Sequence, residues 1–141
     1  MDTSNKDKKK ESKVTKEVDP NEATKDTHSY MVMDTRFEVE KKYEIIDLIG
    51  YGAYGIVIAA KDTSMPEAGK DGAESNLVAI KKIVKAFEHR VFSLRTYREL
   101  KIQRLLEHEN VLGIKRILKP KNRESFNEIY VVSELMETDL A

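Results

Sequence analysis

The sequence predicts an α+β domain in which a five-stranded antiparallel sheet carries one main helix, preceded by a disordered, charged tail. Three observations lead to this prediction. The composition changes sharply near Tyr43, short apolar and β-branched runs then alternate with turn-forming residues, and one stretch, residues 92–107, combines spaced leucines with no glycine or proline. Short runs between turns are typical of strands, and the long uninterrupted stretch is typical of a helix.

Residues 1–42 form the expected tail. They are rich in Lys, Asp, Glu, Thr and Ser and show no sustained apolar period. Such a segment buries too little surface to offset the entropy lost on ordering. Two parts of it leave alternatives open: residues 31–39 fit an edge strand or a docked arm, and the charge run at residues 6–10 fits a solvated segment or, less well, a patch for docking or nuclear import.

Residues 43–141 are expected to form the globular part, with the element order β-β-β-α-β-β. A glycine-rich turn joins the first two strands, which should form a hairpin. A long loop with Gly, Pro, Ser and Asp, residues 62–76, precedes the third strand. The expected strands are residues 43–49, 56–60, 77–83, 114–118 and 129–132, and the expected helix is residues 92–107.

The turn of the hairpin, residues 50–57, fits the pattern G-x-G-x-x-G-x-V. Glycines allow backbone N–H groups to approach phosphate oxygens without an intervening Cβ. The pattern alone fits an ordinary tight turn equally well. A strand rather than a helix follows the glycines, which excludes a dinucleotide-binding turn, and the absence of Gly-Lys-Ser/Thr excludes a Walker loop. A glycine loop between two antiparallel strands is the arrangement found in protein kinases.

The third strand carries the V-A-I-K pattern, which ends at Lys81. Alternation puts Ala79 and Lys81 on one face, where a small residue beside a lysine suits a flat base next to phosphates. A carboxylate is needed to orient that lysine, and Glu99 in the middle of the predicted helix is the candidate. Taken singly, a strand lysine is commonly a surface residue and a helix glutamate a solvated charge. Lys82 is the expected example of such a surface lysine.

The composition excludes several classes of function. Lys and Arg number 25, as do Asp and Glu, so the zero net charge gives no electrostatic basis for binding nucleic acid or an acidic membrane. The absence of cysteine excludes disulfides and thiolate metal sites. No apolar run has the length of a membrane span, and the N-terminus lacks an apolar signal region. We expect a cytoplasmic or nuclear protein.

Further segments resemble the MAP kinases of the extracellular-signal-regulated branch. After the glycine loop and V-A-I-K come Phe-Glu-His at 87–89, Arg-Glu-Leu-Lys-Ile at 98–102, His-Glu-Asn-Val at 108–111 and Leu-Met-Glu-Thr-Asp-Leu at 135–140. The resemblance extends from residue 43 to the last residue. It implies that this part is a protein kinase N-terminal lobe that ends at the hinge.

The resemblance also implies roles for the matching residues. Lys81, held by Glu99, would contact the α- and β-phosphates of ATP, and these two residues are the catalytic candidates. Ser133 would be the gatekeeper behind the adenine. Arg95 and Arg98 resemble helix arginines that contact a phosphothreonine. The candidates for ATP binding are Ile49, Gly50, Gly52, Ala53, Tyr54, Gly55, Val57, Ala79, Lys81, Ser133, Glu134, Met136 and Asp139.

The sequence contains neither H-R-D nor D-F-G, the motifs that supply the catalytic base and the Mg²⁺ ligands of a protein kinase. We therefore expect no metal ligand in residues 43–141, a truncated lobe, and no activity from this chain alone. ATP, Mg²⁺, protein substrates and an upstream activating kinase would serve the full-length serine/threonine kinase, without nucleic acid or membrane. The alternative is a catalytically inactive binding module or decoy. One departure from the family is Gln103, which stands where an apolar residue is usual.

Overall fold

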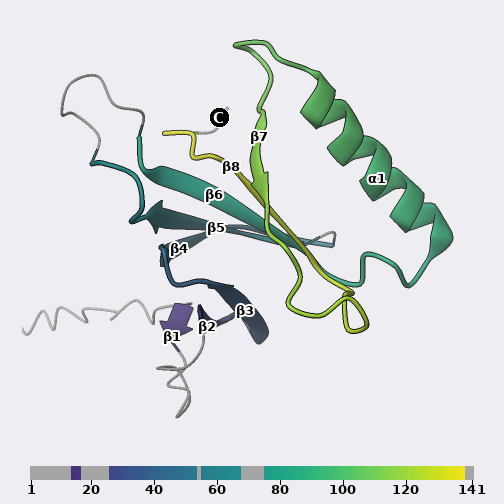
Figure 1. The fold of residues 1–141 in the computed structure, drawn as a ribbon, viewed down its shortest axis with the longest axis horizontal. Coiled ribbons are helices and arrows are strands. Elements are labelled where there is room, and N and C mark those ends of the chain that lie inside the picture. The colour runs from purple at the N-terminus through teal and green to yellow at the C-terminus, as the bar shows by residue number, and fades with distance from the viewer. Residues whose placement is uncertain (1–13, 17–25, 54, 68–74, 139–141) are drawn as a thin grey trace, which may run out of the picture.

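The computed structural model describes residues 14–16, 26–53, 55–67 and 75–138, and it contains two antiparallel sheets and one helix. Figure 1 shows the helix and the smaller sheet on opposite sides of the larger sheet. The strands are β1 (Val14–Lys16), β2 (Thr27–Val32), β3 (Thr35–Glu40), β4 (Tyr43–Gly52), β5 (Gly55–Asp62), β6 (Leu77–Ile83), β7 (Ile114–Ile117) and β8 (Ile129–Glu134), and the helix is α1 (Arg90–Leu105).

The larger sheet has five strands in the order β4-β5-β6-β8-β7, and each strand is antiparallel to its neighbours. β4 and β5 form the glycine-rich hairpin, and β6 occupies the centre of the sheet. The predicted fold, a five-stranded antiparallel sheet with one main helix, is confirmed. Strand boundaries differ from the predicted ones by a few residues at most, because β4 and β5 continue pairing into the glycine-rich turn.

The prediction of a disordered tail over residues 1–42 is wrong for residues 27–40. β2 and β3 form a hairpin that pairs Thr27 with Glu40 at one end and Val32 with Thr35 at the other, and β1 pairs with β2. Residues 31–39, for which an edge strand or a docked arm was open, belong to this hairpin. Residues 1–13 and 17–25 lie outside the described residues, so disorder there stays a prediction.

The physical reason is a period-two pattern that the charged composition hides. Tyr30 and Val32 in β2, and Phe37 and Val39 in β3, are at most 6% exposed. Apolar residues at alternate positions give a strand one buried face. In β3 the residues on the other face include Arg36, which is exposed, and Glu38, which is partly exposed. These charged residues lower the average apolar content, so an average over the whole segment conceals the strands.

The main hydrophobic core lies between the two sheets. One face of the larger sheet supplies residues from β5, β6 and β8, and the smaller sheet supplies residues from β2 and β3. Full burial of one such side chain stabilises the fold by about 1.5–3 kcal/mol, so the N-terminal strands are an integral part of the domain. The members are Tyr30, Val32, Phe37, Val39, Tyr43, Ile56, Ile58, Ala60, Val78, Ile80, Leu118 and Val132.

Ion pairs fasten the outer strand β3 to the side of the larger sheet. Arg116 Nη2 lies 3.0 Å from Glu40 Oε1, and Lys121 contacts Glu38. Burial opposes the ionisation of Glu38, but the hydrogen bond and the charge of Lys121 outweigh it and hold the pKa of Glu38 below its ordinary value. Both pairs are partly exposed, so they orient β3 more than they stabilise it.

α1 begins and ends two residues earlier than predicted. The Ser93 hydroxyl lies 2.9 Å from the carbonyl oxygen of Ala86 and 3.0 Å from that of His89, which ties the first turn to the preceding loop. The helix ends where Leu106 adopts an extended conformation. No residue of α1 is buried, and Leu100 packs partly against a small second cluster on the other face of the sheet. Among the described residues, no helix is long and apolar enough to cross a membrane.

Candidate nucleotide-binding site

The strand register gathers the expected adenine and phosphate contacts on one face of the larger sheet. Val57 of β5 lies opposite Lys81 of β6, and Ala79 of β6 lies opposite Ser133 of β8. Opposite residues in antiparallel strands point to the same face, as do residues two apart. These four side chains therefore share the face that the N-terminal sheet does not cover.

Lys81 and Glu99 are in contact below the glycine-rich hairpin. Lys81 Nζ donates a hydrogen bond to Glu99 Oε1 at 3.1 Å. The two side chains are 37% and 47% exposed, so the pair adds at most about 1 kcal/mol to stability. Its main effect is geometric, because it fixes the position of the ammonium group on the face described above. The expected contact is present, and the catalytic role of the pair stays a prediction.

A cavity of about 580 Å³ lies beside this ion pair. Its lining combines Ala53 of the glycine-rich turn, the segment after β6 and the first half of α1, and it includes the basic side chains of Lys81, Lys85, His89 and Arg95. Arg98 borders a separate groove with Leu94 and Ile102. The two arginines expected to contact one phosphothreonine therefore border different cavities.

The glycines of the hairpin differ in what the fold requires of them. Gly55 has a φ of +147°, and a Cβ placed on it would overlap the backbone carbonyl of Lys82. The fold itself therefore needs glycine at this position. A Cβ on Gly52 would meet nothing within 4 Å, and Gly52 lacks a positive φ. Open space above a backbone without a Cβ fits the close approach of a phosphate group.

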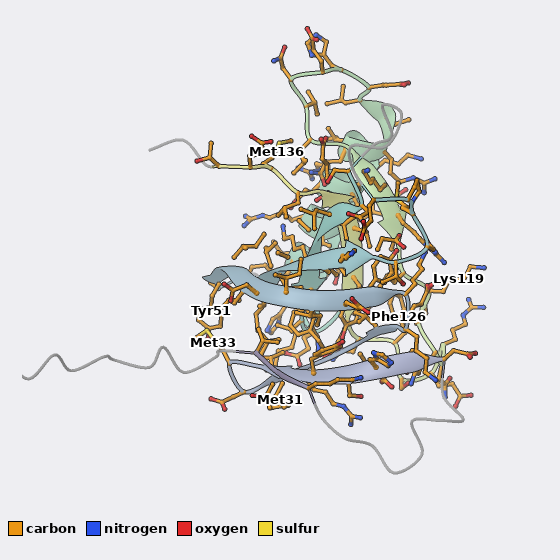
Figure 2. All side chains as sticks on the ribbon, turned by 90° about the vertical axis from the view of Figure 1, so that its left-hand side faces the viewer. Met31, Met33, Tyr51, Lys119, Phe126 and Met136 are labelled. Atoms are coloured by element: carbon orange, nitrogen blue, oxygen red, sulfur yellow. The ribbon has the colours of Figure 1, made fainter. Side chains whose placement is uncertain are left out.

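The remaining candidates lie around this face. Ile49 and Met136 are half exposed, and Glu134 is the last residue of β8. Figure 2 shows Tyr51 and Met136 on one side of the molecule and Lys119 and Phe126 on the opposite side. Tyr54 and Asp139 lie outside the described residues, so their expected roles stay predictions.

Lys82 was expected on the surface, and this prediction is wrong. Its side chain is only 2% exposed. The ammonium group lies between the two sheets, 2.9 Å from Glu128 Oε1, and hydrogen-bonds to the carbonyl oxygen of Arg36. The error follows from the assignment of residues 27–40 to a disordered tail, because without β3 this face of β6 would be open to solvent. Alternation with the buried Ile80 was the signal that could have revealed it.

Comparison with known proteins finds relatives that are similar to this chain over most of its length. It is 46% identical over 115 residues to Extracellular signal-regulated kinase 1 of Dictyostelium discoideum, 47% over 113 residues to Mitogen-activated protein kinase 4 of Oryza sativa, and 49% over 104 residues to Mitogen-activated protein kinase mpkB of Aspergillus fumigatus. These matches cover 82%, 80% and 74% of this chain, but only 20%, 28% and 27% of the relatives. No family model matches the chain. With its kinase small-lobe fold, its glycine-rich hairpin and its Lys81–Glu99 pair, the chain belongs with the MAP kinases, as a counterpart of their N-terminal lobe.

Proposed function

We propose that this chain forms the ATP-binding lobe of a MAP-kinase-like serine/threonine protein kinase. The observation that carries the proposal is the Lys81–Glu99 ion pair, at 3.1 Å, on the sheet face that also holds Ala79 and Ser133. The names of the relatives support it, and the chain spans about a fifth to just over a quarter of their length.

In this proposal each part of the site has a distinct task. Val57 and Ala79 present a flat apolar surface to the adenine, and the open backbone at Gly52 admits a phosphate. Lys81 binds the α- and β-phosphates while Glu99 keeps its ammonium group in position. Bound Mg-ATP supplies the phosphoryl group for transfer to a protein Ser or Thr hydroxyl. The residues that hold Mg²⁺ and the base that accepts the hydroxyl proton are proposed to come from outside this lobe.

A second function has one observation in its favour. α1 carries several large apolar side chains that are 44–71% exposed: Val91, Phe92, Leu94, Tyr97, Ile102 and Leu105. A helix with this much exposed apolar surface fits a protein partner. A binding module or decoy would use this surface without any need for nucleotide. Binding of Mg-ATP distinguishes the two functions, because only the kinase lobe requires it.

The proposal is tested by a pair of glycine variants, measured for Mg-ATP affinity and for thermal unfolding. Gly52→Ala is expected to weaken Mg-ATP binding about tenfold, or 1.4 kcal/mol, because the new Cβ occupies the space proposed for the phosphate. The melting temperature should change little, because this Cβ meets no protein atom within 4 Å. Gly55→Ala is expected to cost about 2–6 kcal/mol of folding stability, from backbone strain and steric overlap of ~1–3 kcal/mol each. Unchanged nucleotide affinity in Gly52→Ala, with Mg-ATP bound by the wild type, would argue against this phosphate site.

The size of Ser133 predicts a deep pocket for adenine analogues. Ser133 is half-buried at the end of β8 and lies opposite Ala79, so little side-chain volume closes the space behind the adenine. Ser133→Met is expected to weaken an adenine analogue with a bulky aromatic group by at least about tenfold, while Mg-ATP affinity changes little. The matched control is Ser125→Met, since Ser125 lies in an exposed loop. Equal affinity of the analogue for wild type and Ser133→Met would show that Ser133 does not limit the pocket.

A further inference from the structure

A polar network on the far face of β6 joins the two sheets. Lys82 of β6 and Tyr130 of β8 lie directly opposite each other, on the face turned away from the candidate nucleotide site. Lys82 Nζ is 2.9 Å from Glu128 Oε1 and lies 5.4 Å from the centre of the Tyr130 ring. The Tyr130 hydroxyl lies 3.5 Å from Glu128 Oε2. We call Lys82, Glu128 and Tyr130 the latch.

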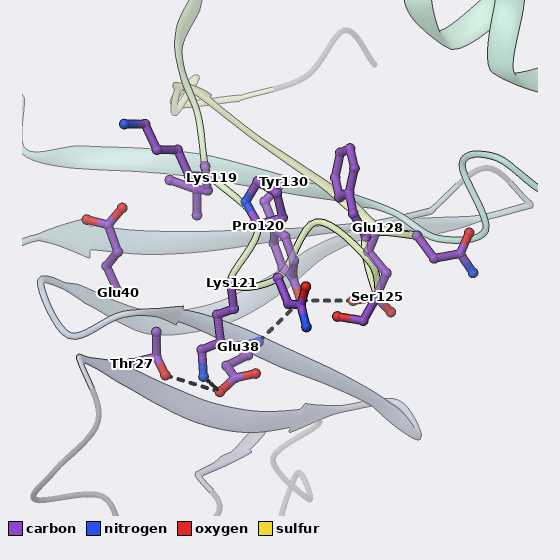
Figure 3. A pocket seen from close by; sticks show the side chains of 13 residues that line it. Thr27, Glu38, Glu40, Lys119, Pro120, Lys121, Ser125, Glu128 and Tyr130 are labelled. Atoms are coloured by element: carbon purple, nitrogen blue, oxygen red, sulfur yellow. Dashed lines mark hydrogen bonds and ion pairs between the residues drawn. The ribbon is translucent and has the colours of Figure 1, made fainter.

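The latch holds β3 by its outer edge. Within the described part of the chain β3 pairs with β2 alone, so along its other edge the backbone groups face away from the smaller sheet. Such a row of unpaired groups is normally a liability. Here the Lys82 ammonium donates to the Arg36 carbonyl oxygen, and the Glu38 N–H donates to the Tyr130 hydroxyl at 3.2 Å. Figure 3 shows Tyr130 between Glu38 and Glu128. Two side chains of the larger sheet thus take the place of a neighbouring strand.

Lys82 and Tyr130 are largely buried, and each has close partners. The Lys82 ammonium is buried and paired with a carboxylate, and it also lies 5.5 Å from the centre of the Phe37 ring. A buried ammonium is tolerated only with such partners. Burial raises the pKa of the Tyr130 hydroxyl above its ordinary value, so the hydroxyl keeps its proton and can donate to Glu128.

β3 and the latch residue Lys82 each connect to the glycine-rich hairpin. β3 ends at Glu40 and β4 begins at Tyr43, so two residues separate the strands, and Gly50 and Gly52 lie at the far end of β4. On β6, the carbonyl of Lys82 lies where a Cβ on Gly55 would clash, so the last glycine rests against the backbone of a latch residue. Lys82 also follows Lys81 directly. The contact between Gly55 and the carbonyl of Lys82 is therefore the direct link between the latch and the tip of the hairpin, whereas β3 joins the hairpin at its other end.

We propose that Lys82, Glu128 and Tyr130 are positioning residues, which fix the height of the glycine-rich hairpin above Lys81 by latching the edge of β3. The effect on nucleotide rests on the proposed function, but the effect on the hairpin does not. Through the latch, the N-terminal sheet affects nucleotide affinity, although Lys82, Glu128 and Tyr130 do not lie on the nucleotide face.

Hydrogen exchange of the nucleotide-free protein tests the latch directly. Tyr130→Phe removes the acceptor of the Glu38 N–H with almost no change in shape. The Glu38 amide is expected to exchange at least about tenfold faster, and the amides of residues 51–53 are expected to accelerate with it. The Phe37 amide, which strand alternation directs toward β2, should keep its protection. The matched control is Tyr30→Phe, which removes a buried tyrosine hydroxyl that lies 3.5 Å from His28 rather than in the latch.

Nucleotide titration of the same proteins completes the test. Lys82→Met and Tyr130→Phe are expected to raise the Kd for Mg-ATP about fivefold. In the longest natural protein that contains this sequence, they are expected to raise the KM for Mg-ATP by a similar factor while kcat is unchanged, because Lys81 is intact. An unchanged Glu38 amide in Tyr130→Phe overturns the latch. A faster Glu38 amide with unchanged amides at residues 51–53 overturns its positioning role. If the wild type fails to bind Mg-ATP, the proposed function falls, whereas the exchange measurements still decide the latch.

Discussion

Replacement of Lys81 by Met is expected to lower phosphoryl transfer at least about 100-fold, the usual cost of removing one preorganised charge from a transition state. Lys81 is half exposed, and its ion pair with Glu99 contributes at most about 1 kcal/mol to stability, so the variant should still fold. Lys81→Arg should lose most of the activity as well, because the larger planar guanidinium cannot take the same place between Glu99 and the phosphates.

The measurement is a steady-state transfer assay on the longest natural protein that contains this sequence, with circular dichroism to confirm folding. Lys119→Met is the matched control, since it removes the same charge from an exposed loop residue outside the candidate nucleotide site. Glu99→Gln should lower activity in the same direction as Lys81→Met, because it leaves the ammonium group without its carboxylate partner. Near wild-type turnover in Lys81→Met would remove Lys81 from the mechanism.

Replacement of Phe37 by Ala is expected to destabilise the domain by about 3–5 kcal/mol, the usual cost of deleting a buried phenylalanine side chain. Phe37 is fully buried between the sheets, where its ring lies 5.8 Å from that of Tyr130 in an edge-to-face arrangement. A domain of this size has a total stability of only about 5–15 kcal/mol. Thermal unfolding should therefore occur at least about 12 °C lower than in the wild type.

Tyr97→Ala serves as the comparison for Phe37→Ala. Tyr97 is also aromatic, but it is 65% exposed on α1, and its loss should cost less than about 1 kcal/mol. Chemical denaturation with a common m-value gives both free energies. Equal stabilities of Phe37→Ala and wild type would mean that the N-terminal sheet does not share the core of the domain in solution.

Local sequence signals located most of the candidate site. The V-A-I-K strand places Ala79 and Lys81 on one face by alternation alone, and the glycine pattern places the hairpin. The prediction of the Lys81–Glu99 contact depended on the order of three motifs along the chain. In the structure, Lys81 Nζ lies 3.1 Å from Glu99 Oε1. Composition failed at residues 27–40, because it averages over both faces of a strand, whereas folding depends only on whether one face is apolar.

By itself, the sequence determined the order along the chain of the five strands and the helix, the glycine-rich hairpin and the likeness to MAP kinases, since these depend on short-range patterns and turn chemistry. Only the tertiary structure showed that the Lys82 side chain is buried. Alternation puts Lys82 on the same face of β6 as Ile80, but burial of its ammonium group becomes possible only when Glu128, Tyr130 and the edge of β3 converge on it. Arg36 of β3 and Glu128 each lie 46 residues from Lys82 in sequence, Tyr130 lies 48 residues from it, and no local pattern reports a contact between strands that far apart.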